Sequence, residues 1–170
     1  MYLKNVTAPG KLQMDVKYVT PELSGLPHTV FLYAVIDIFS RYKAGVIYPE
    51  LVQDFSIETL KQVSLPFEAD FVQTDNGLEF QSRFHDFVTK KRLWNHHYIH
   101  KSNPNENAVI ERSFRTDEEE FFFWQMRKPI SLDDLNTQYQ DFLHEYNHVR
   151  PHLGISLKTP YALLQECSIC

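Results

Sequence analysis

Three carboxylates stand where the sequence could build a chemical site. Asp75 follows a segment expected to be a buried strand, Ala69 to Thr74, and the chain then turns on Asn76-Gly77. The carboxyl end of a central strand is where open α/β sheets place their reactive groups. Asp15 lies in an alternating apolar segment and Glu111 on a predicted helix, with 35 residues between Asp75 and Glu111. Carboxylate oxygens so placed could bind hard divalent cations such as Mg²⁺, which prefer oxygen ligands.

Five motifs containing or flanking these residues follow the order and spacing of a known family. They are Met14-Asp15-Val16-Lys17-Tyr18, Val35-Ile36-Asp37-Ile38-Phe39-Ser40-Arg41, Thr74-Asp75-Asn76-Gly77-Leu78-Glu79-Phe80, Ser102-x-Pro104-x-x-Asn107-Ala108-x-x-Glu111-Arg112, and Tyr146-Asn147-x-x-Arg150-Pro151-His152 with Thr159-Pro160. On these motifs the chain, from about Gly10 to Leu164, resembles the catalytic core of the D,D-35-E recombinases. That family comprises retroviral-type integrases and the related insertion-sequence transposases.

The resemblance implies a chemistry for the three carboxylates. Asp15, Asp75 and Glu111 would be catalytic and would hold two Mg²⁺ (or Mn²⁺) ions, because phosphoryl transfer needs an activated oxygen nucleophile and a stabilised leaving group. Water and then a DNA 3′-hydroxyl would attack phosphodiesters, so the expected activity is nicking at element ends followed by strand transfer. Three like charges in one pocket also repel, which is expected to raise at least one carboxyl pKa without metal.

The resemblance also implies partners and a location. The partners would be DNA, as element ends and as target, and further copies of the chain in a homodimer or larger assembly. The location would be the bacterial cytoplasm, in association with the nucleoid. Asn107, one turn before Glu111, is the first candidate for a DNA contact, and Lys17, Arg115 and Lys101 are further candidates.

One position departs from the family pattern in a way that bears on DNA. Relatives often carry a lysine or arginine seven residues after the catalytic glutamate, whereas this chain has Glu118 within the acidic run Asp117 to Glu120. The net charge of −5 points the same way, because phosphate contacts supply most of the affinity of DNA-binding proteins. The acidic balance therefore argues against tight duplex binding by this core alone.

Length and composition indicate one globular domain over residues 1–170. Hydrophobic residues make up 43% of the chain, yet no apolar run is long enough to span a bilayer. We expect the N-terminal DNA-recognition region of relatives to be absent. Two alternatives stay open: an inactive or domesticated core kept for dimerisation or DNA binding, and a ribonuclease-H-like nuclease that cuts without joining.

Three histidines suggest a zinc site that the strand pattern argues against. Alternation on a short strand would point His96 and His97 to opposite faces, so His96, His97 and His100 are not predicted to bind zinc. His100 lies near enough to the loop before Glu111 to reach DNA.

The remaining candidates have structural interpretations. Asp37 is interpreted as a hydrogen-bonding residue of the fold, and the Cys167–Cys170 pair as a bystander because no second pair completes a metal site. The aromatic run Phe121 to Trp124 is expected in the core or at a dimer contact. Asn147, Arg150 and His152 could either brace the fold or contact DNA, and both readings stay open.

Residue periodicity predicts the elements that would bring the carboxylates together. The predicted strands run through Asp15 to about Thr20 and over Thr29 to Phe39, Lys43 to Tyr48, Ala69 to Thr74 and Trp94 to Ile99. The predicted helices are Asp54 to Leu65, Leu78 to Arg92, one opening near Asn105 and one beginning near Ser131. This order predicts an α/β fold, a mixed five-stranded sheet flanked by helices, which is the ribonuclease-H-like architecture that the resemblance implies.

Overall fold

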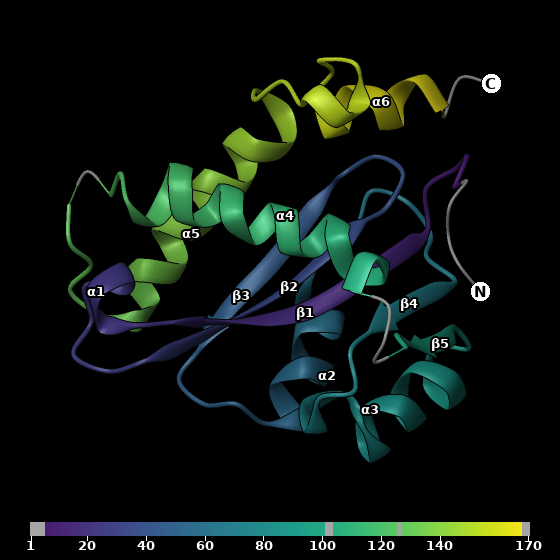
Figure 1. The fold of residues 1–170 in the computed structure, drawn as a ribbon, viewed down its shortest axis with the longest axis horizontal. Coiled ribbons are helices and arrows are strands. Elements are labelled where there is room, and N and C mark those ends of the chain that lie inside the picture. The colour runs from purple at the N-terminus through teal and green to yellow at the C-terminus, as the bar shows by residue number, and fades with distance from the viewer. Residues whose placement is uncertain (1–5, 101–103, 126, 168–170) are drawn as a thin grey trace.

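The computed structural model describes residues 6–100, 104–125 and 127–167, and it contains one mixed sheet in the order β3-β2-β1-β4-β5 (Figure 1). The strands are β1 (Lys11–Val19), β2 (Val30–Asp37), β3 (Lys43–Tyr48), β4 (Phe71–Thr74) and β5 (Asn95–Tyr98). The first three form an antiparallel meander, whereas β4 runs parallel to both β1 and β5. The predicted ribonuclease-H-like fold, with five strands of mixed direction, is confirmed.

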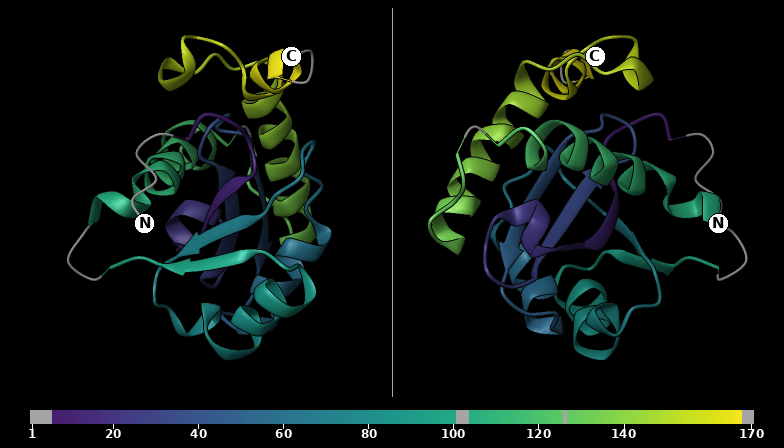
Figure 2. Two further views of the ribbon diagram at one scale, coloured as in Figure 1. Left: turned by 90° about the vertical axis from the view of Figure 1, so that its right-hand side faces the viewer. Right: turned by 60° about the vertical axis from the view of Figure 1, so that its left-hand side comes forward.

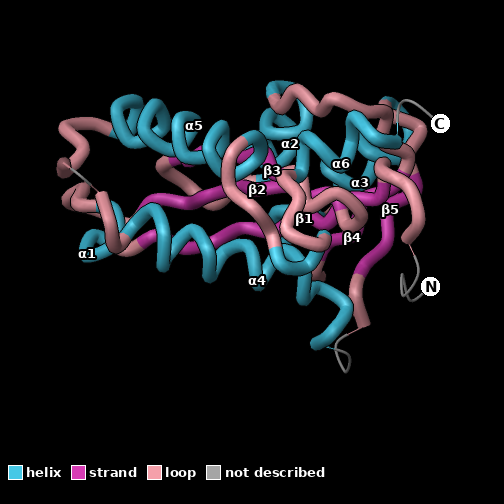
Figure 3. The backbone as a smooth tube through the Cα atoms, turned by 90° about the horizontal axis from the view of Figure 1, so that it is seen from above, coloured by secondary structure: helices cyan, strands magenta, loops and turns pink. Residues whose placement is uncertain are grey.

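Helices cover both faces of this sheet (Figure 2). They are α1 (Pro21–Ser24), α2 (Gln53–Gln62), α3 (Ser82–Asp86), α4 (Ala108–Thr116), α5 (Leu132–His148) and α6 (Pro160–Cys167). α4 and α5 pack on one face of the sheet, and α2 and α3 pack on the other. Strands of the sheet are visible between α4 and α5 in Figure 3. None of the helices in the described ranges is both long enough and apolar enough to cross a membrane.

The central strand β2 explains why helices lie on both sides. Its side chains alternate, so that Leu32, Ala34 and Ile36 join the core under α4 and α5. Tyr33 and Val35 join the opposite core under α2 and α3. A strand that is apolar on both faces can be stable only when both faces are covered.

One predicted helix is wrong. Leu78 to Arg92 is not continuous: a 3₁₀ turn over Leu78–Phe80 precedes α3, and a π-helical turn over Phe87–Lys91 follows it. The break falls at Ser82, whose φ of 41° lies in the left-handed region. Its apolar residues Phe80, Phe84 and Val88, which are spaced four apart, are nevertheless all fully buried. Burial of these three side chains therefore outweighs the regularity of the helix.

The predicted start of the next helix is also displaced. A 3₁₀ turn over Pro104–Asn107 precedes α4, so the helix begins at Ala108 and not near Asn105. One stripe of α4 and the segment after it, formed by Ile110, Phe114 and Phe121, is buried against the sheet. The Asp37 prediction is confirmed as well: its carboxylate accepts from the Gly10 and Ser40 backbone N–H groups at 2.9 and 2.7 Å.

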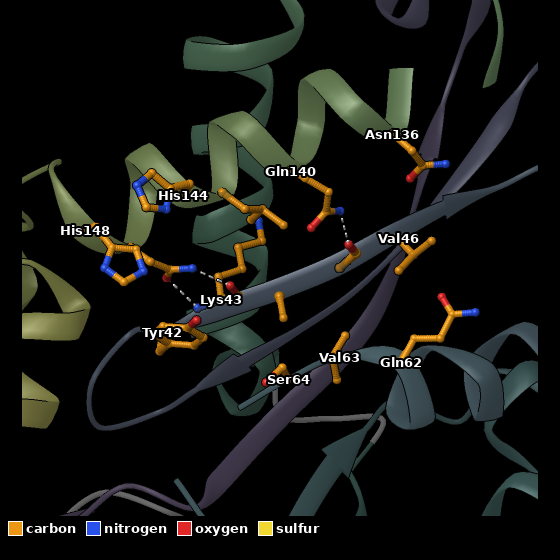
Figure 4. Close-up of a pocket in the computed structure, with 14 residues that line it drawn as sticks. Tyr42, Lys43, Val46, Gln62, Val63, Ser64, Asn136, Gln140, His144 and His148 are labelled. Carbon is orange, nitrogen blue, oxygen red and sulfur yellow. Dashed lines mark hydrogen bonds between the residues drawn. The ribbon is translucent and has the colours of Figure 1, made fainter. Parts of the chain in front are cut away.

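The outer edge of β3 is covered by carboxamide side chains of α5 (Figure 4). Asn147 donates to the Lys43 carbonyl and accepts from the Lys43 N–H, at 2.7 and 2.9 Å. Asn136 pairs with both backbone groups of Ile47 in the same way, and Gln140 donates to the Gly45 carbonyl. Of the two readings left open for Asn147, the structure shows the bracing role.

A buried ion pair joins β3 to the helical segment after α4. The Lys43 ammonium contacts the Asp117 carboxylate, and both side chains are 0% exposed. The Tyr139 hydroxyl lies 3.4 Å from the same carboxylate. A buried charge is tolerated only while its partner is present, so this pair fixes the position of Asp117 relative to the sheet.

Asp117→Asn is expected to lower the free energy of unfolding by about 3–5 kcal/mol, because Lys43 would be left buried without a carboxylate. Urea denaturation measures the loss, with Asp141→Asn on the exposed face of α5 as the control. The double variant Lys43→Met/Asp117→Leu removes both charges and should recover most of the stability. Losses that simply add in the double variant would contradict the coupling.

Candidate functional site

The site begins with two neighbouring strands that place their carboxylates level with each other. β1 and β4 are parallel and pair Gln13 with Gln73 in register. Asp15 and Asp75 each follow that pair by two residues, so both lie beyond it on the same side of the sheet. Asp75 comes directly after the end of β4, where its carboxylate accepts from the Gly77 N–H at 2.8 Å.

The helix α4 crosses the same face of the sheet and carries Glu111 in its first turn. The polar residues of β1 that alternate with its apolar core residues, Gln13, Asp15 and Lys17, all contact α4 or the segments at its ends. Glu111 is exposed, beside the stripe of α4 that is buried against the sheet. The structure thus brings Asp15, Asp75 and Glu111 to one place on the molecule.

Electrostatics shows how closely the carboxylates are grouped. The pKa of Asp15 is raised to about 7, chiefly by burial and in smaller part by the charges of Asp75, Glu111 and Glu79, against the lowering effect of the hydrogen bond from the Val16 N–H. The expected elevation of at least one carboxyl pKa is therefore present. The ligand atoms of Asp15, Asp75 and Glu111, all described residues, do not yet lie within 4.8 Å of one another.

Glu79 is a fourth carboxylate that sequence reasoning did not assign to the site. Burial raises its pKa, and the charge of Asp75 adds to the shift. The turn brings it close because residue 77 is glycine: a Cβ there would lie 2.6 Å from the Glu79 carboxyl group. The motif Asp75-Asn76-Gly77-Leu78-Glu79 could have indicated this, because a turn at Asn76-Gly77 brings the second acidic residue back toward the first.

Asn107 is turned inward in this structure. Its side-chain N–H₂ donates to Asp15 at 3.1 Å, and the residue is only 2% exposed. Its side-chain oxygen is buried and lacks a hydrogen-bond partner among the described residues. The group that was expected to meet DNA therefore holds the central carboxylate, and it adds an unused oxygen to the site.

Two buried glutamines hold the beginning of α4 in place, and sequence reasoning missed both. The Gln13 and Gln73 side chains each donate to the Glu106 carbonyl, at 2.6 and 2.5 Å. Gln13 also accepts from the Ile110 N–H at 3.0 Å. Because Gln13 and Gln73 are cross-strand partners, a single pair of carboxamides fixes α4 to the two strands that carry Asp15 and Asp75.

The acidic run is neutralised within the molecule. Besides the buried Asp117 pair, Glu118 contacts Lys17, Glu119 contacts Arg115 and Glu120 contacts Arg150. The run is therefore not a free acidic surface. Of the expected DNA contacts, Lys17 and Arg115 are engaged in these pairs, and Lys101 lies outside the described residues.

The remaining candidates are distributed between core and surface. Phe121 and Phe122 are buried in the core, whereas Phe123 and Trp124 are 65% and 77% exposed. His152 is buried and its ring meets the Tyr146 carbonyl, which is a bracing contact. Cys167 is an exposed free thiol, and its presumed companion Cys170 lies outside the described residues.

Comparisons with known proteins agree with this geometry. The family described as "Integrase core domain" matches residues 93–160. A protein of Escherichia coli K12 described as the transposase InsK of insertion sequence element IS150 is 27% identical, over 91% of this chain. Over residues 93–160 the chain is therefore similar to integrase core domains. It spans 58% of the length of the InsK protein.

The fold of this chain resembles those of solved viral integrase structures. The catalytic core of BIV integrase matches with a TM-score of 0.69 at 17% identity, over 93% of this chain and 95% of that one. The HTLV-2 integrase core, solved in complex with magnesium, matches with a TM-score of 0.69 at 18% identity, over 93% and 98%. A chain in the structure of the simian T-cell lymphotropic virus intasome with a PP2A regulatory subunit gives a TM-score of 0.74 at 16% identity, over 96% and 57%.

Without metal, the protein is expected to lose stability as the pH rises from about 4 to about 7. The folded Asp15 keeps its proton up to a pKa of about 7, whereas the unfolded chain releases it near 3.8. Its contribution is therefore complete below pH 3.8 and is lost as the pH passes through about 7, a change of at most about 4 kcal/mol. Urea denaturation across this range should show a flatter curve for Asp15→Asn. Equal curves for both proteins would contradict the assignment.

Proposed function

We propose that this chain is the catalytic core of a DNA transposase, a metal-dependent polynucleotidyl transferase. It would nick DNA at element ends and transfer the 3′-hydroxyl strand into target DNA. The observation that carries the proposal is the group of carboxylates acting on Asp15, at the meeting point of β1, β4 and α4. The transposase relative and the integrase-type fold support it.

The donor set suits hard divalent ions. Asp15, Asp75 and Glu111 would hold two Mg²⁺ or Mn²⁺ ions, for which oxygen ligands and retained waters are the preferred shell. When bound, such ions activate the attacking oxygen and stabilise the leaving alkoxide. The raised pKa of Asp15 and the buried, unpartnered oxygen of Asn107 are what a cation at this place would relieve. The magnesium complex of the HTLV-2 core supports the choice of ion.

The chain's own residues position these ligands. Asn107 orients Asp15 through its hydrogen bond, and the Gly77 N–H orients Asp75. Glu79 adds negative charge beside Asp75 and strengthens the attraction for a cation. Glu111, exposed on α4, is the ligand that completes the set by side-chain rotation.

DNA would bind along the face of α4 beside this site. Lys17 and Arg115 would exchange Glu118 and Glu119 for phosphates, Asn107 lies at the carboxylates, and Lys101 would extend the contact. We further propose a homodimer or larger assembly that holds two active sites, with the exposed Phe123 and Trp124 as contact candidates. The HTLV-2 core, described in dimeric and trimeric forms, supports assembly.

The remaining parts of the proposal concern the whole chain. Residues 1–170 would form one catalytic domain, acting in the bacterial cytoplasm in association with the nucleoid, as suits a relative of an Escherichia coli transposase.

Asp75→Asn is expected to reduce Mg²⁺-dependent cleavage of element-end DNA by more than about 100-fold, because a metal ligand is lost. Circular dichroism should show an intact fold. Asp70→Asn is the matched control: Asp70 is an exposed residue just before β4 and pairs with the half-buried Lys11. Joined products alongside cleavage indicate a transferase, and cleavage without joining indicates a nuclease. An unchanged cleavage rate in Asp75→Asn would refute the metal site, and no Mg²⁺-dependent cleavage by the unmodified chain would point to an inactive core.

Glu118→Gln is expected to strengthen non-specific DNA binding by releasing Lys17 from its ion pair. The slope of log K against log salt should steepen by up to about one unit, which corresponds to one added phosphate contact. Glu118→Lys should steepen it by up to about two units, since it adds a charge as well as releasing one.

A remote substitution provides the control. Glu22→Lys changes an exposed carboxylate on α1 and should alter the slope much less, because exposed charges beyond a Debye length are screened. Equal changes for Glu22→Lys and Glu118→Lys would show that Glu118 has no special place on the DNA path.

A further inference from the structure

A second group of metal-ligating side chains lies between the end of β5 and the turn that precedes α4. Within the described ranges, His97, His100 and Glu106 form a group of three whose ligand atoms all lie within 4.8 Å of one another. None of the three belongs to the carboxylate site. The alternation argument from the sequence is correct for His96, which turns to the other face and contacts Thr74 and His85. It could not foresee that Glu106 would supply the missing third ligand.

The distances between ligand atoms in this group are close to those around a tetrahedrally coordinated zinc ion. Zinc binds histidine nitrogen and carboxylate oxygen at about 2.0–2.2 Å, which places neighbouring ligand atoms about 3.4 Å apart. The His100 Nδ1 atom lies 3.2 Å from Glu106 Oε1, and His97 Nε2 lies 4.0 Å from Glu106 Oε2. The two imidazole rings are 5.7 Å apart between centroids. Since all three ligand atoms lie within 4.8 Å of one another, side-chain adjustments of about an ångström would bring the Glu106 carboxylate and both rings to ligand distance.

An independent observation points to a missing ligand at this place. The Nε2 atom of His97 is buried and has no hydrogen-bond partner in the described part of the chain. A buried polar atom without a partner is costly, and a metal ion would satisfy it. The nearest acidic group is the Glu106 carboxylate, which already accepts from the His100 N–H at 2.8 Å. That bond orients the carboxylate toward the rings.

We propose that His97, His100 and Glu106 bind one divalent transition-metal ion of the zinc class. Two imidazoles and one carboxylate suit zinc, with water in the fourth position, whereas Mg²⁺ prefers an all-oxygen shell. The ion would fasten the turn before α4 to the end of β5. This proposal does not depend on the proposed catalytic activity.

The position of Glu106 gives the site a consequence for α4. Its backbone carbonyl is the acceptor shared by Gln13 and Gln73, and the next residue, Asn107, holds Asp15. An ion bound to the Glu106 side chain would therefore immobilise the residue whose carbonyl attaches the start of α4 to β1 and β4. The expected effect is slower exchange of the amides over 106–110.

The test is a titration of the untagged, chelator-treated chain with Zn²⁺ in excess Mg²⁺, so that the carboxylate site is occupied by the harder ion. One Zn²⁺ per chain is expected by calorimetry, and Co²⁺ should give the visible band of a four-coordinate ion. At free Zn²⁺ one hundred times Kd, the Tm should rise by about 5–10 °C. Hydrogen exchange should slow over 106–110.

Single-ligand variants identify the site. Glu106→Gln removes the carboxylate charge but keeps a hydrogen-bond acceptor. His97→Gln changes a residue of the edge strand β5, outside the turn that contains Glu106. Both should raise the Kd for Zn²⁺ more than tenfold. His28→Gln, an exposed histidine elsewhere, should leave the Kd unchanged.

A competing pair needs its own control. His144 and His148 lie one turn apart on α5 with ring centroids separated by 4.6 Å, and they could hold an ion by themselves. The double variant His144→Gln/His148→Gln should keep full binding. The proposal is overturned if that variant loses the ion, if His97→Gln and Glu106→Gln both bind normally, or if exchange over 106–110 does not respond to Zn²⁺.

Discussion

The arrangement of the site depends on two buried carboxamides. The start of a helix leaves backbone N–H groups without partners, and each one buried unsatisfied costs about 1–3 kcal/mol. Gln13 accepts from one of these groups at Ile110, while Gln13 and Gln73 together hold the Glu106 carbonyl. Since the two glutamines face each other across β1 and β4, the helix cannot shift relative to either strand without breaking their bonds. The relation of Glu111 to Asp15 and Asp75 follows from this attachment.

The far end of the same helical segment is attached by charge. The buried contact between Asp117 and Lys43 reaches across to β3, and Glu118 reaches Lys17 on β1. Polar attachments at both ends thus hold α4 over a group of carboxylates that repel one another. These attachments, and not contacts among the carboxylates themselves, keep the site assembled. The fold can therefore hold Asp15 in surroundings that raise its pKa.

Patterns of neighbouring residues in the sequence predicted the strands and the positions of the three carboxylates. The β-branched and aromatic residues of Thr29 to Phe39 indicated a buried strand, and short motifs gave the positions of Asp15, Asp75 and Glu111. Partners distant in the sequence were not predictable: nothing near Asp117 indicates that Lys43 neutralises it, and nothing near Gln73 indicates Glu106. The helix break at Ser82 was missed for a related reason. Phe80 and Phe84 pack against each other and against residues of the sheet that are distant in the sequence. Glu79 differs, because it lay inside a motif that had already been singled out.

The carboxamides of Asn136, Gln140 and Asn147 have a consequence for how copies of this chain can associate. An outer strand with free backbone groups is a template on which another chain can add a strand, and proteins must block it to avoid joining into extended sheets. Here the β3 backbone is already occupied by side chains of α5. Two copies therefore cannot merge their sheets across β3 into one continuous sheet unless α5 first separates from it. With the β3 edge blocked, association is left to the other edge strand, β5, and to helical and loop surfaces such as the one that carries Phe123 and Trp124.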